Sequence, residues 1–201
     1  DLLDRVSYED WDMSTTARDF NYLYDSGTRG RMKIYRVNSN NQDISVYYNS
    51  YDFLGNPTKE SHSYKNPGLA TYSNYIFLKT YDLLSRETKV TYPFSVLTVN
   101  TTYNATGAIE KITRGTSTLS NVISDIDYTP AGQVSSMTYA NGVVTTNSYD
   151  PAESYRLTNK TTTGSYGGVS GNIQNLAYSY DAVGNITGIA DTSITPTAKT
   201  I

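Results

Sequence analysis

The chain has 201 residues and a formal net charge of −3, so it is long enough to fold and lacks the basic surface of a nucleic-acid-binding protein. It contains no cysteine, which excludes disulfides and cysteine-based zinc sites, and no apolar run near the roughly 20 residues of a membrane-spanning helix. Twenty tyrosines beside only 17% charged residues argue against disorder and favour a β-rich protein with an uncharged polar surface.

In chain order, the predicted elements are copies of one repeat. The opening DLLDRV (1–6) matches DLLSRE (82–87), so we expect residue 1 to fall inside a repeat and the chain to be a fragment of a longer one. Seven complete copies follow: YDSGTRGRM (24–32), YDFLGNP (51–57), YDLLSRE (81–87), YNATGAI (103–109), YTPAGQV (128–134), YDPAESYRL (149–157) and YDAVGNI (180–186). We therefore predict one repeat region, 1–201, with about seven complete repeats and a truncated first one.

Each copy predicts a turn between two β-strands. An aspartate at the first position of a type I turn accepts hydrogen bonds from main-chain N–H groups, and glycine at the fourth position tolerates a positive φ angle. Asn104 and Thr129 keep an acceptor at the first position, and Ser85 keeps a small residue at the fourth. The predicted structural residues of the repeat are Tyr24, Asp25, Gly30, Tyr51, Asp52, Gly55, Tyr81, Asp82, Tyr103, Gly107, Tyr128, Gly132, Tyr149, Asp150, Tyr180, Asp181 and Gly184.

The segments between the turns predict strands. Residues 111–115, 135–149 and 156–163 are rich in threonine, valine, isoleucine and tyrosine, and Asn141–Gly142 is a strong hairpin signal. No segment has helical periodicity, and the glycine-rich stretch 165–172 is expected to be a loop. The fold class is therefore all-β: antiparallel hairpins stacked side by side in a curved, spiralling open sheet with little or no helix. We expect the repeat tyrosines to interlock neighbouring hairpins through ring contacts.

Tyr-Asp-x-x-Gly, followed by arginine or asparagine and an apolar residue, resembles the YD repeat of the RHS (rearrangement hotspot) family. YANGVVTTNSYD (139–150) resembles a stretch found in bacterial members, and the resemblance covers essentially the whole chain. It implies a sheet that spirals into a hollow shell, which encloses a toxic C-terminal domain in toxin complexes and polymorphic toxins. The chain lacks the DPxG…DP end motif and any toxin domain after the repeats, so self-cleavage and toxicity are not carried over.

The residues suited to chemistry have simpler explanations. His62 is the single histidine and lies in the polar stretch 59–66, read as a loop, so a catalytic triad or a histidine metal site would depend on it alone. The acidic residues of the repeats each have a role in a turn, and no EF-hand motif is present. We therefore predict that the protein is not an enzyme and has no catalytic residue, cofactor or metal.

These observations predict a structural scaffold: a YD-repeat shell segment that encloses or displays a polypeptide cargo, such as a toxin, in a secreted or cell-surface bacterial protein. The expected partners are the rest of its own longer chain and an enclosed C-terminal polypeptide, without nucleic acid and without a membrane span. The alternative is a cell-wall-associated or adhesive module whose tyrosine rings stack on carbohydrate. A parent chain with further repeats and a variable C-terminal domain would favour the shell over the adhesive module.

Overall fold

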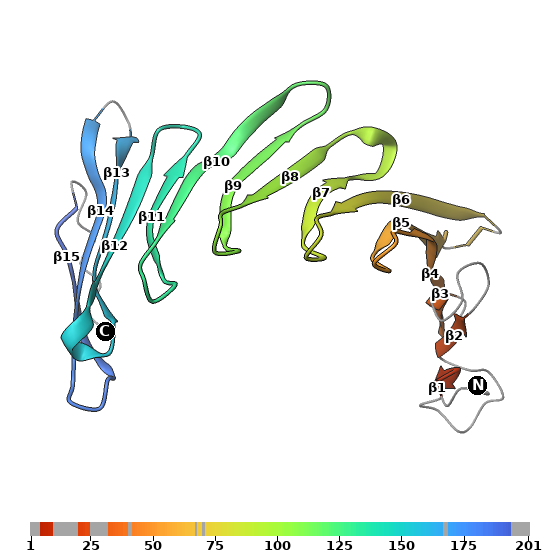
Figure 1. Ribbon diagram of the computed structural model, residues 1–201, viewed down its shortest axis with the longest axis horizontal. Coiled ribbons are helices and arrows are strands. Elements are labelled where there is room, and N and C mark those ends of the chain that lie inside the picture. The colour runs from red at the N-terminus through yellow and green to blue at the C-terminus, as the bar shows by residue number, and fades with distance from the viewer. Residues whose placement is uncertain are drawn as a thin grey trace. The chain divides into compact units, whose positions relative to one another are not determined.

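The computed structural model describes residues 5–9, 20–24, 32–39, 42–66, 68–69, 71–166 and 169–193. The chain divides into two compact units (Figure 1). Unit 1 comprises Asp1–Asn100 with Gly115–Ser117, and unit 2 comprises Thr101–Arg114 with Thr118–Ile201. The two units are described separately below.

The described residues form strands that follow one another across the sheet in sequence order, and the paired strands are antiparallel. Two short 3₁₀ turns, η1 (Pro93–Ser95) and η2 (Pro151–Glu153), are their helical segments. The predicted fold class, all-β antiparallel hairpins in an open sheet with little helix, is confirmed. The strands are β1 (Tyr8–Glu9), β2 (Phe20–Tyr24), β3 (Met32–Ser39), β4 (Gln42–Tyr51), β5 (Pro57–Lys65), β6 (Tyr72–Tyr81), β7 (Glu87–Thr91), β8 (Thr98–Tyr103), β9 (Ile109–Gly115), β10 (Leu119–Tyr128), β11 (Val134–Tyr139), β12 (Val144–Asp150), β13 (Arg156–Tyr166), β14 (Val169–Tyr180) and β15 (Ile186–Asp191).

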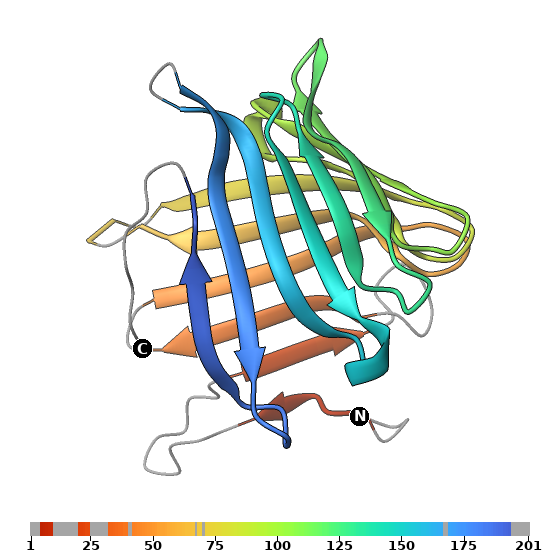
Figure 2. The same cartoon turned by 90° about the vertical axis from the view of Figure 1, so that its left-hand side faces the viewer.

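Within each unit the strands lie side by side in a single twisted layer (Figure 2). Among the described residues, Ile126 and Pro93 are the buried apolar side chains, so neither unit has the core of a two-layer domain. The sheet is therefore held by main-chain ladders and by contacts between neighbouring strands.

Hydroxyl and amide side chains bond to one another across the strands of unit 2. On one face, Thr161 donates to the side-chain oxygen of Asn175 at 3.2 Å, and Asn175 donates to Thr192 at 2.7 Å. On the opposite face, Thr162 lies 3.0 Å from the Thr145 hydroxyl and donates to Gln174 at 3.3 Å. Both faces thus carry polar groups that already have partners.

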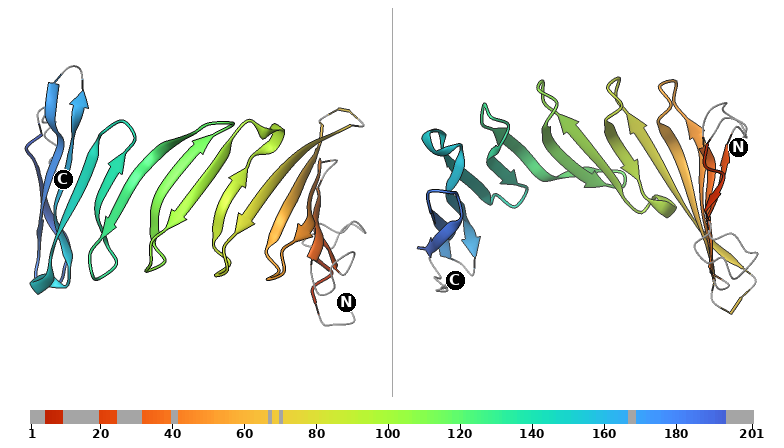
Figure 3. Two further views of the ribbon diagram at one scale, coloured as in Figure 1. Left: turned by 45° about the horizontal axis from the view of Figure 1, so that its top comes forward. Right: turned by 90° about the horizontal axis from the view of Figure 1, so that it is seen from below.

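Each repeat whose turn the structure describes contributes a strand that ends near its tyrosine, a turn, and a return strand. In each unit the repeat turns therefore lie at one end of the strands, and the connections between repeats lie at the opposite end (Figures 1 and 3). The connections differ in form, from the 3₁₀ turn η1 to the tight turn at 139–143. This variation among the connections explains the uneven spacing of the repeats.

Two loop predictions are wrong. His62 lies in the middle of β5, where it pairs with Val46 on one side and Tyr75 on the other. Residues 165–166 and 169–172, read as loop, belong to β13 and β14, with Ser165 opposite Ser170. A single-layer sheet has no buried face, so its strands need no alternation of apolar and polar residues, and polar or glycine-rich segments are compatible with it.

Candidate functional site: the contacts between successive repeats

The short repeat turns that the structure describes share one main-chain geometry, seen clearly at Asp52. The Asp52 N–H donates to the carbonyl of Asn56 at 2.9 Å, and the Gly55 N–H donates to the carbonyl of Asp52 at 3.1 Å. Gly55 has a φ of 92°, which is a left-handed conformation. This is a hairpin loop of three residues, a type I turn followed by a left-handed residue. The motif therefore closes a hairpin with glycine where positive φ is required.

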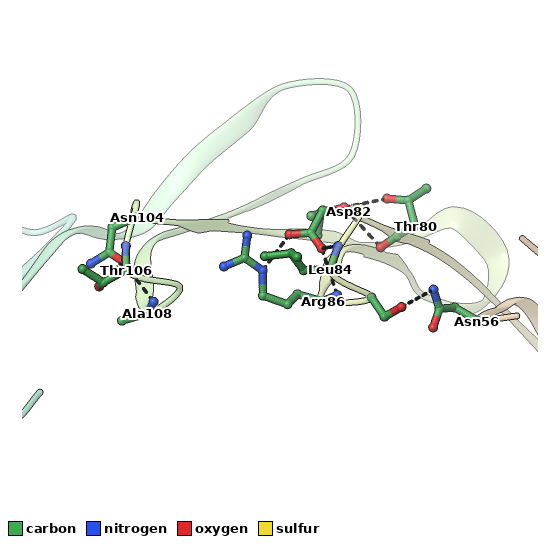
Figure 4. Close-up of polar contacts among 10 residues, drawn as sticks. Asn56, Thr80, Asp82, Leu84, Arg86, Asn104, Thr106 and Ala108 are labelled. Carbon is green, nitrogen blue, oxygen red and sulfur yellow. Dashed lines mark hydrogen bonds and ion pairs between the residues drawn. The ribbon is translucent and has the colours of Figure 1, made fainter. Parts of the chain in front are cut away.

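The aspartate side chain ties the same turn together. The Asp181 carboxylate accepts the main-chain N–H groups of Val183 at 3.1 Å and Asn185 at 2.8 Å, and the Asn185 amide at 2.8 Å. The Asp82 carboxylate likewise accepts the N–H of Arg86 at 3.0 Å and its Nε at 2.7 Å (Figure 4). These carboxylates are bound as ions within their own turns.

Hydrogen bonding lowers the pKa of these carboxyls. The pKa of Asp181 lies below its ordinary value of 3.8, chiefly because the side-chain amide and the N–H of Asn185 donate to the carboxylate. At Asp52 and Asp82 partial desolvation favours the neutral acid, but hydrogen bonds from Asn56 and Arg86 outweigh it, and the pKa is again lowered. The carboxylates are therefore accounted for by the turns.

The copies that depart from the consensus keep the turn. The side-chain oxygen of Asn104 accepts the N–H groups of Thr106 and Ala108, both at 3.0 Å (Figure 4). The Thr129 hydroxyl accepts one N–H, from Gln133 at 3.2 Å. Ser85 stands where other copies have glycine and still has a φ of 61°.

Two further turns extend the pattern. In the long copy at 149–157, the Asp150 carboxylate caps η2 by accepting the Ala152 N–H at 2.8 Å, and the two added residues are accommodated there. At 139–143 the predicted hairpin is present, but it has a three-residue loop. Gly142 has a φ of 80°, whereas the φ of Asn141 is not positive. The Asn-Gly pair thus uses the geometry of the repeat turns and not a two-residue turn.

Four repeat tyrosines join their repeat to the one before it. Tyr128 donates its hydroxyl to the Ile109 carbonyl at 2.7 Å, Tyr149 donates to Val134 at 2.9 Å, and Tyr180 donates to Leu157 at 2.7 Å. Tyr51 makes the same bond to the carbonyl of Met32. We call this contact the tyrosine–carbonyl bond. The sequence predicts ring contacts between repeat tyrosines, whereas these four tyrosines donate their hydroxyls to main-chain carbonyls.

The acceptor of this bond holds a fixed place in the repeat. Met32, Ile109, Val134 and Leu157 are the apolar residues that close the motif, at or next to the start of a return strand. Six strands that end in a repeat tyrosine, four of which carry this bond, have a register shift immediately before that tyrosine. The shifts fall at Leu23/Tyr24, Ser50/Tyr51, Thr80/Tyr81, Asp127/Tyr128, Ser148/Tyr149 and Ser179/Tyr180. A bulge of this kind re-aims the side chain that follows it.

In three repeats the residue that precedes the closing apolar residue reaches the next turn. Asn56 donates to the Ser85 hydroxyl at 3.1 Å, Gln133 donates to the Tyr155 carbonyl at 3.0 Å, and Arg156 donates to the Asp181 carbonyl at 3.2 Å. These bonds explain why polar residues such as arginine and asparagine occupy that position. The sequence shows that arginine or asparagine often occupies this position. It does not show the bond, because the hydrogen-bond partner belongs to another repeat.

Arginines add contacts to the tyrosine rings. The Arg156 guanidinium lies 5.7 Å from the centre of the Tyr180 ring, and the Arg5 guanidinium lies 4.3 Å from that of Tyr24. Arg156 also lies over the next turn, since a side-chain carbon added at Gly184 would come within 3.1 Å of its Nη2. Three parts of the repeat, its tyrosine, its glycine and its arginine, therefore meet between neighbours.

The remaining predicted residues are placed as follows. Tyr24, Tyr81 and Tyr103 end β2, β6 and β8, and Gly107 and Gly132 have φ angles of 91° and 83°. Asp25 and Gly30 lie outside the described residues. That all the predicted repeat residues share one structural role, in the turns and in the contacts between repeats, stays a proposal.

Four titratable side chains of unit 1, Glu60, His62, Lys79 and Glu87, form a cluster on β5, β6 and β7. The Glu60 carboxylate lies 2.8 Å from Lys79 Nζ and 3.4 Å from His62 Nε2, and Lys79 lies 3.8 Å from Glu87. Desolvation disfavours the ammonium of Lys79, but its bond to Glu60 outweighs this and raises the pKa of Lys79. Lys79 therefore lies between the carboxylates of Glu60 and Glu87, which is the arrangement of an ion-pair network.

The described residues contain no group of three or more histidine, cysteine, aspartate or glutamate side chains placed to hold a metal ion. In the same part of the chain, neither helical segment has the length and apolarity to cross a bilayer.

No family model and no curated protein matches the sequence. Solved structures do match, at identities that show the fold alone. A crystal structure of TcdB2-TccC3 has a TM-score of 0.76 and 19% identity over 89% of this chain and 9% of that one. A Tc holotoxin pore from Photorhabdus luminescens has a TM-score of 0.77 and 19% identity over 90% and 9%. TcdB2-TccC3 without its hypervariable C-terminal region has a TM-score of 0.65 and 17% identity over 86% and 10%. The chain thus spans about a tenth of the length of these neighbours.

Proposed function

We propose that this chain is a segment of a YD-repeat wall within a longer secreted or surface-exposed bacterial polypeptide, and that the wall encloses or displays another polypeptide. The observation that carries the proposal is the set of tyrosine–carbonyl bonds, which join repeats in chain order. A sheet extended this way grows by adding repeats, and it needs no second layer. Such growth suits a wall better than a compact domain with a cleft.

Two further observations support the proposal. The strands of unit 2 carry hydroxyl and amide groups on both faces, and these groups bond to one another. A surface of this kind offers an unfolded cargo few unpaired polar groups. One of the structural neighbours that share the fold is named as a Tc holotoxin pore. Enclosure of a toxic C-terminal segment is the function that the RHS resemblance implies.

The reading frame upstream of Asp1 and downstream of Ile201 gives the first test. We expect many further Tyr-Asp-x-x-Gly copies and then an unrelated C-terminal domain. A frame that ends close to these residues, or that continues into wall-binding modules, contradicts enclosure.

Protease protection of the natural polypeptide gives the second test. We expect the C-terminal segment to resist a protease while the repeats are folded. It should become sensitive when Thr162→Pro interrupts an inner strand of unit 2, because proline removes an N–H from the ladder. Val183→Ser, in an exposed turn, is the control and should leave the protection intact. Digestion of the C-terminal segment at the same rate in all three proteins contradicts enclosure.

A further inference from the structure

A small cavity lies in unit 1 beside η1, the connection between β7 and β8. Its volume is about 300 Å³, near the lower limit of the roughly 300–1,000 Å³ found for small-molecule sites. None of its lining residues belongs to a copy of the repeat motif, so the repeat turns do not account for them. The strands that form it, β6 and β7, each pair on both sides, so it does not depend on where the sequence begins or ends.

The connection displays the Phe94 ring at the cost of backbone strain. Phe94 and Ser95 have φ angles of 62° and 55°, which are left-handed conformations. These conformations are costly for residues other than glycine. Phe94 is 78% exposed, so burial of its ring does not offset the cost. Strain that packing does not explain is typical of functional sites.

The ring is also held in place. The Tyr92 N–H donates to the Leu97 carbonyl at 2.8 Å and closes the connection, and Pro93 within it is buried. The Tyr75 ring packs against the Phe94 ring, with 5.8 Å between ring centres and 76° between ring planes. A ring fixed before a ligand arrives lowers the entropy lost on binding.

The lining combines apolar surface with uncharged polar groups. Ile76, Leu78 and Phe94 supply the apolar part, and no lining residue carries a charge, so the cavity favours an uncharged ligand. Asn74 and Ser95 are exposed, and among the described residues neither the Asn74 amide nor the Ser95 hydroxyl makes a hydrogen bond. A wholly apolar partner would cover both groups without pairing them, which is unfavourable. A sugar matches both parts, because it has a face of C–H groups and a rim of hydroxyls.

We propose that this cavity binds an uncharged saccharide of glucose configuration. The C–H face of one pyranose ring stacks on Phe94, and its hydroxyls bond to Asn74 and Ser95. Glucose-configured sugars fit best because their equatorial substituents leave the C–H face flat. The site differs from the adhesive alternative considered for the sequence, which uses the repeat tyrosines. It does not depend on whether the longer polypeptide encloses a cargo.

Titration of the isotope-labelled 201-residue chain with cellotriose, maltotriose and triacetylchitotriose tests the proposal by NMR. We expect at least one of these trisaccharides to bind. The amide shift changes should be centred on residues 74–78 and 91–97, which contain the cavity lining.

Three variants separate binding from folding. Phe94→Gly removes the ring but accepts the left-handed conformation, so the chain should stay folded while its affinity falls about ten-fold or more. Phe94→Trp keeps an aromatic face and should retain binding. Phe53→Ala removes a ring of similar exposure, 83%, from a repeat turn, and this matched control should leave binding unchanged.

Absence of binding by all three trisaccharides overturns the proposal. Equal affinity of the unmodified chain and Phe94→Gly also overturns it, as does an equal loss in Phe53→Ala. Self-association that Phe94→Gly abolishes, without saccharide binding, overturns it as well, since the occupant is then a second copy of the chain. None of these outcomes bears on protease protection, which tests enclosure separately.

Discussion

At the scale of single residues, the hydroxyl group separates tyrosine from phenylalanine in this chain. The sequence has 20 tyrosines and 4 phenylalanines, although either ring would suit an exposed strand. The tyrosine–carbonyl bond gives a reason for the preference at the repeat positions, because phenylalanine has no donor. Tyr180 also receives the Arg156 guanidinium near its ring, a contact that phenylalanine would keep.

Replacing Tyr180 with phenylalanine should lower the free energy of unfolding of unit 2 by about 0.5–1.5 kcal/mol, the net contribution of one hydrogen bond. Tyr178→Phe is the matched control, two residues away on β14, where the structure gives no bond of this kind. Urea unfolding monitored by circular dichroism measures both. Equal losses in the two variants would show that the bond to Leu157 contributes nothing specific.

Three glycines separate the cost of backbone strain from the cost of a clash. Gly184→Ala should destabilise most, because φ is 97° and the new carbon meets Arg156 at 3.1 Å. Gly132→Ala, with a φ of 83° and open space around it, should cost about 1–2 kcal/mol for strain alone. Gly188→Ala, in β15, should cost little, since its nearest contact is at 4.0 Å. Thermal unfolding of the three variants should give this order, and a larger loss at Gly188 would contradict it.

The turn carboxylates predict how stability depends on pH. The pKa values of Asp52, Asp82 and Asp181 are lower in the folded chain than the ordinary value of 3.8. Their contribution is therefore complete well above that value and is lost as the pH falls through the folded pKa values. The urea midpoint should be steady above about pH 5 and decline on further acidification. A triple Asp→Asn variant should show a flatter profile, and an identical slope in both proteins would contradict the assignment.

At the scale of elements, the hairpin turns differ in how many bonds their first residue accepts. Asn104→Ala removes an acceptor for two N–H groups and the Thr106 hydroxyl, and should cost about 1–2 kcal/mol. Thr129→Ala removes one bond of 3.2 Å and should cost about 0.5 kcal/mol. Urea unfolding of the two variants tests the order, and a larger loss for Thr129 would show that the count of bonds does not set turn stability.

The sequence was informative about these turns because their chemistry is local. Asp181, Val183, Gly184 and Asn185 make their bonds within five consecutive residues, so spacing alone predicts the turn. The bond from Tyr180 joins residues 23 positions apart and depends on strand register, which the sequence does not reveal. The β-bulges before the tyrosines were missed for the same reason.

The strands were predicted less well where both faces are polar. His62 was read as loop because residues 59–66 are hydrophilic, yet β5 runs through them. Alternation of apolar and polar residues identifies a strand that has one buried face, and the strands of a one-layer sheet have no buried face. The Glu60–Lys79 pair, which holds this face of β5 to β6, was not anticipated either.

At the scale of the whole molecule, each described repeat contacts its neighbours in sequence, so the effects of substitutions should be local. The Tyr180→Phe variant should speed hydrogen exchange in β13, β14 and β15. Exchange in β5 and β6 of unit 1 should not change. Amide exchange read by mass spectrometry measures this, and uniform acceleration across all strands would show that the chain unfolds as one cooperative body.

The repeat turns and the connections at the opposite ends of the strands differ in function. The connections are therefore the suitable place for insertions. The repeat turns hold the aspartates, the glycines and the residues that reach the next turn. At the opposite ends of the strands, the connection 116–118 makes none of the described bonds between repeats. An epitope tag or a small folded domain placed there would lengthen a loop, which costs little entropy. The lineage of such a protein could therefore gain new surface loops on that side while its repeat motif stays recognisable.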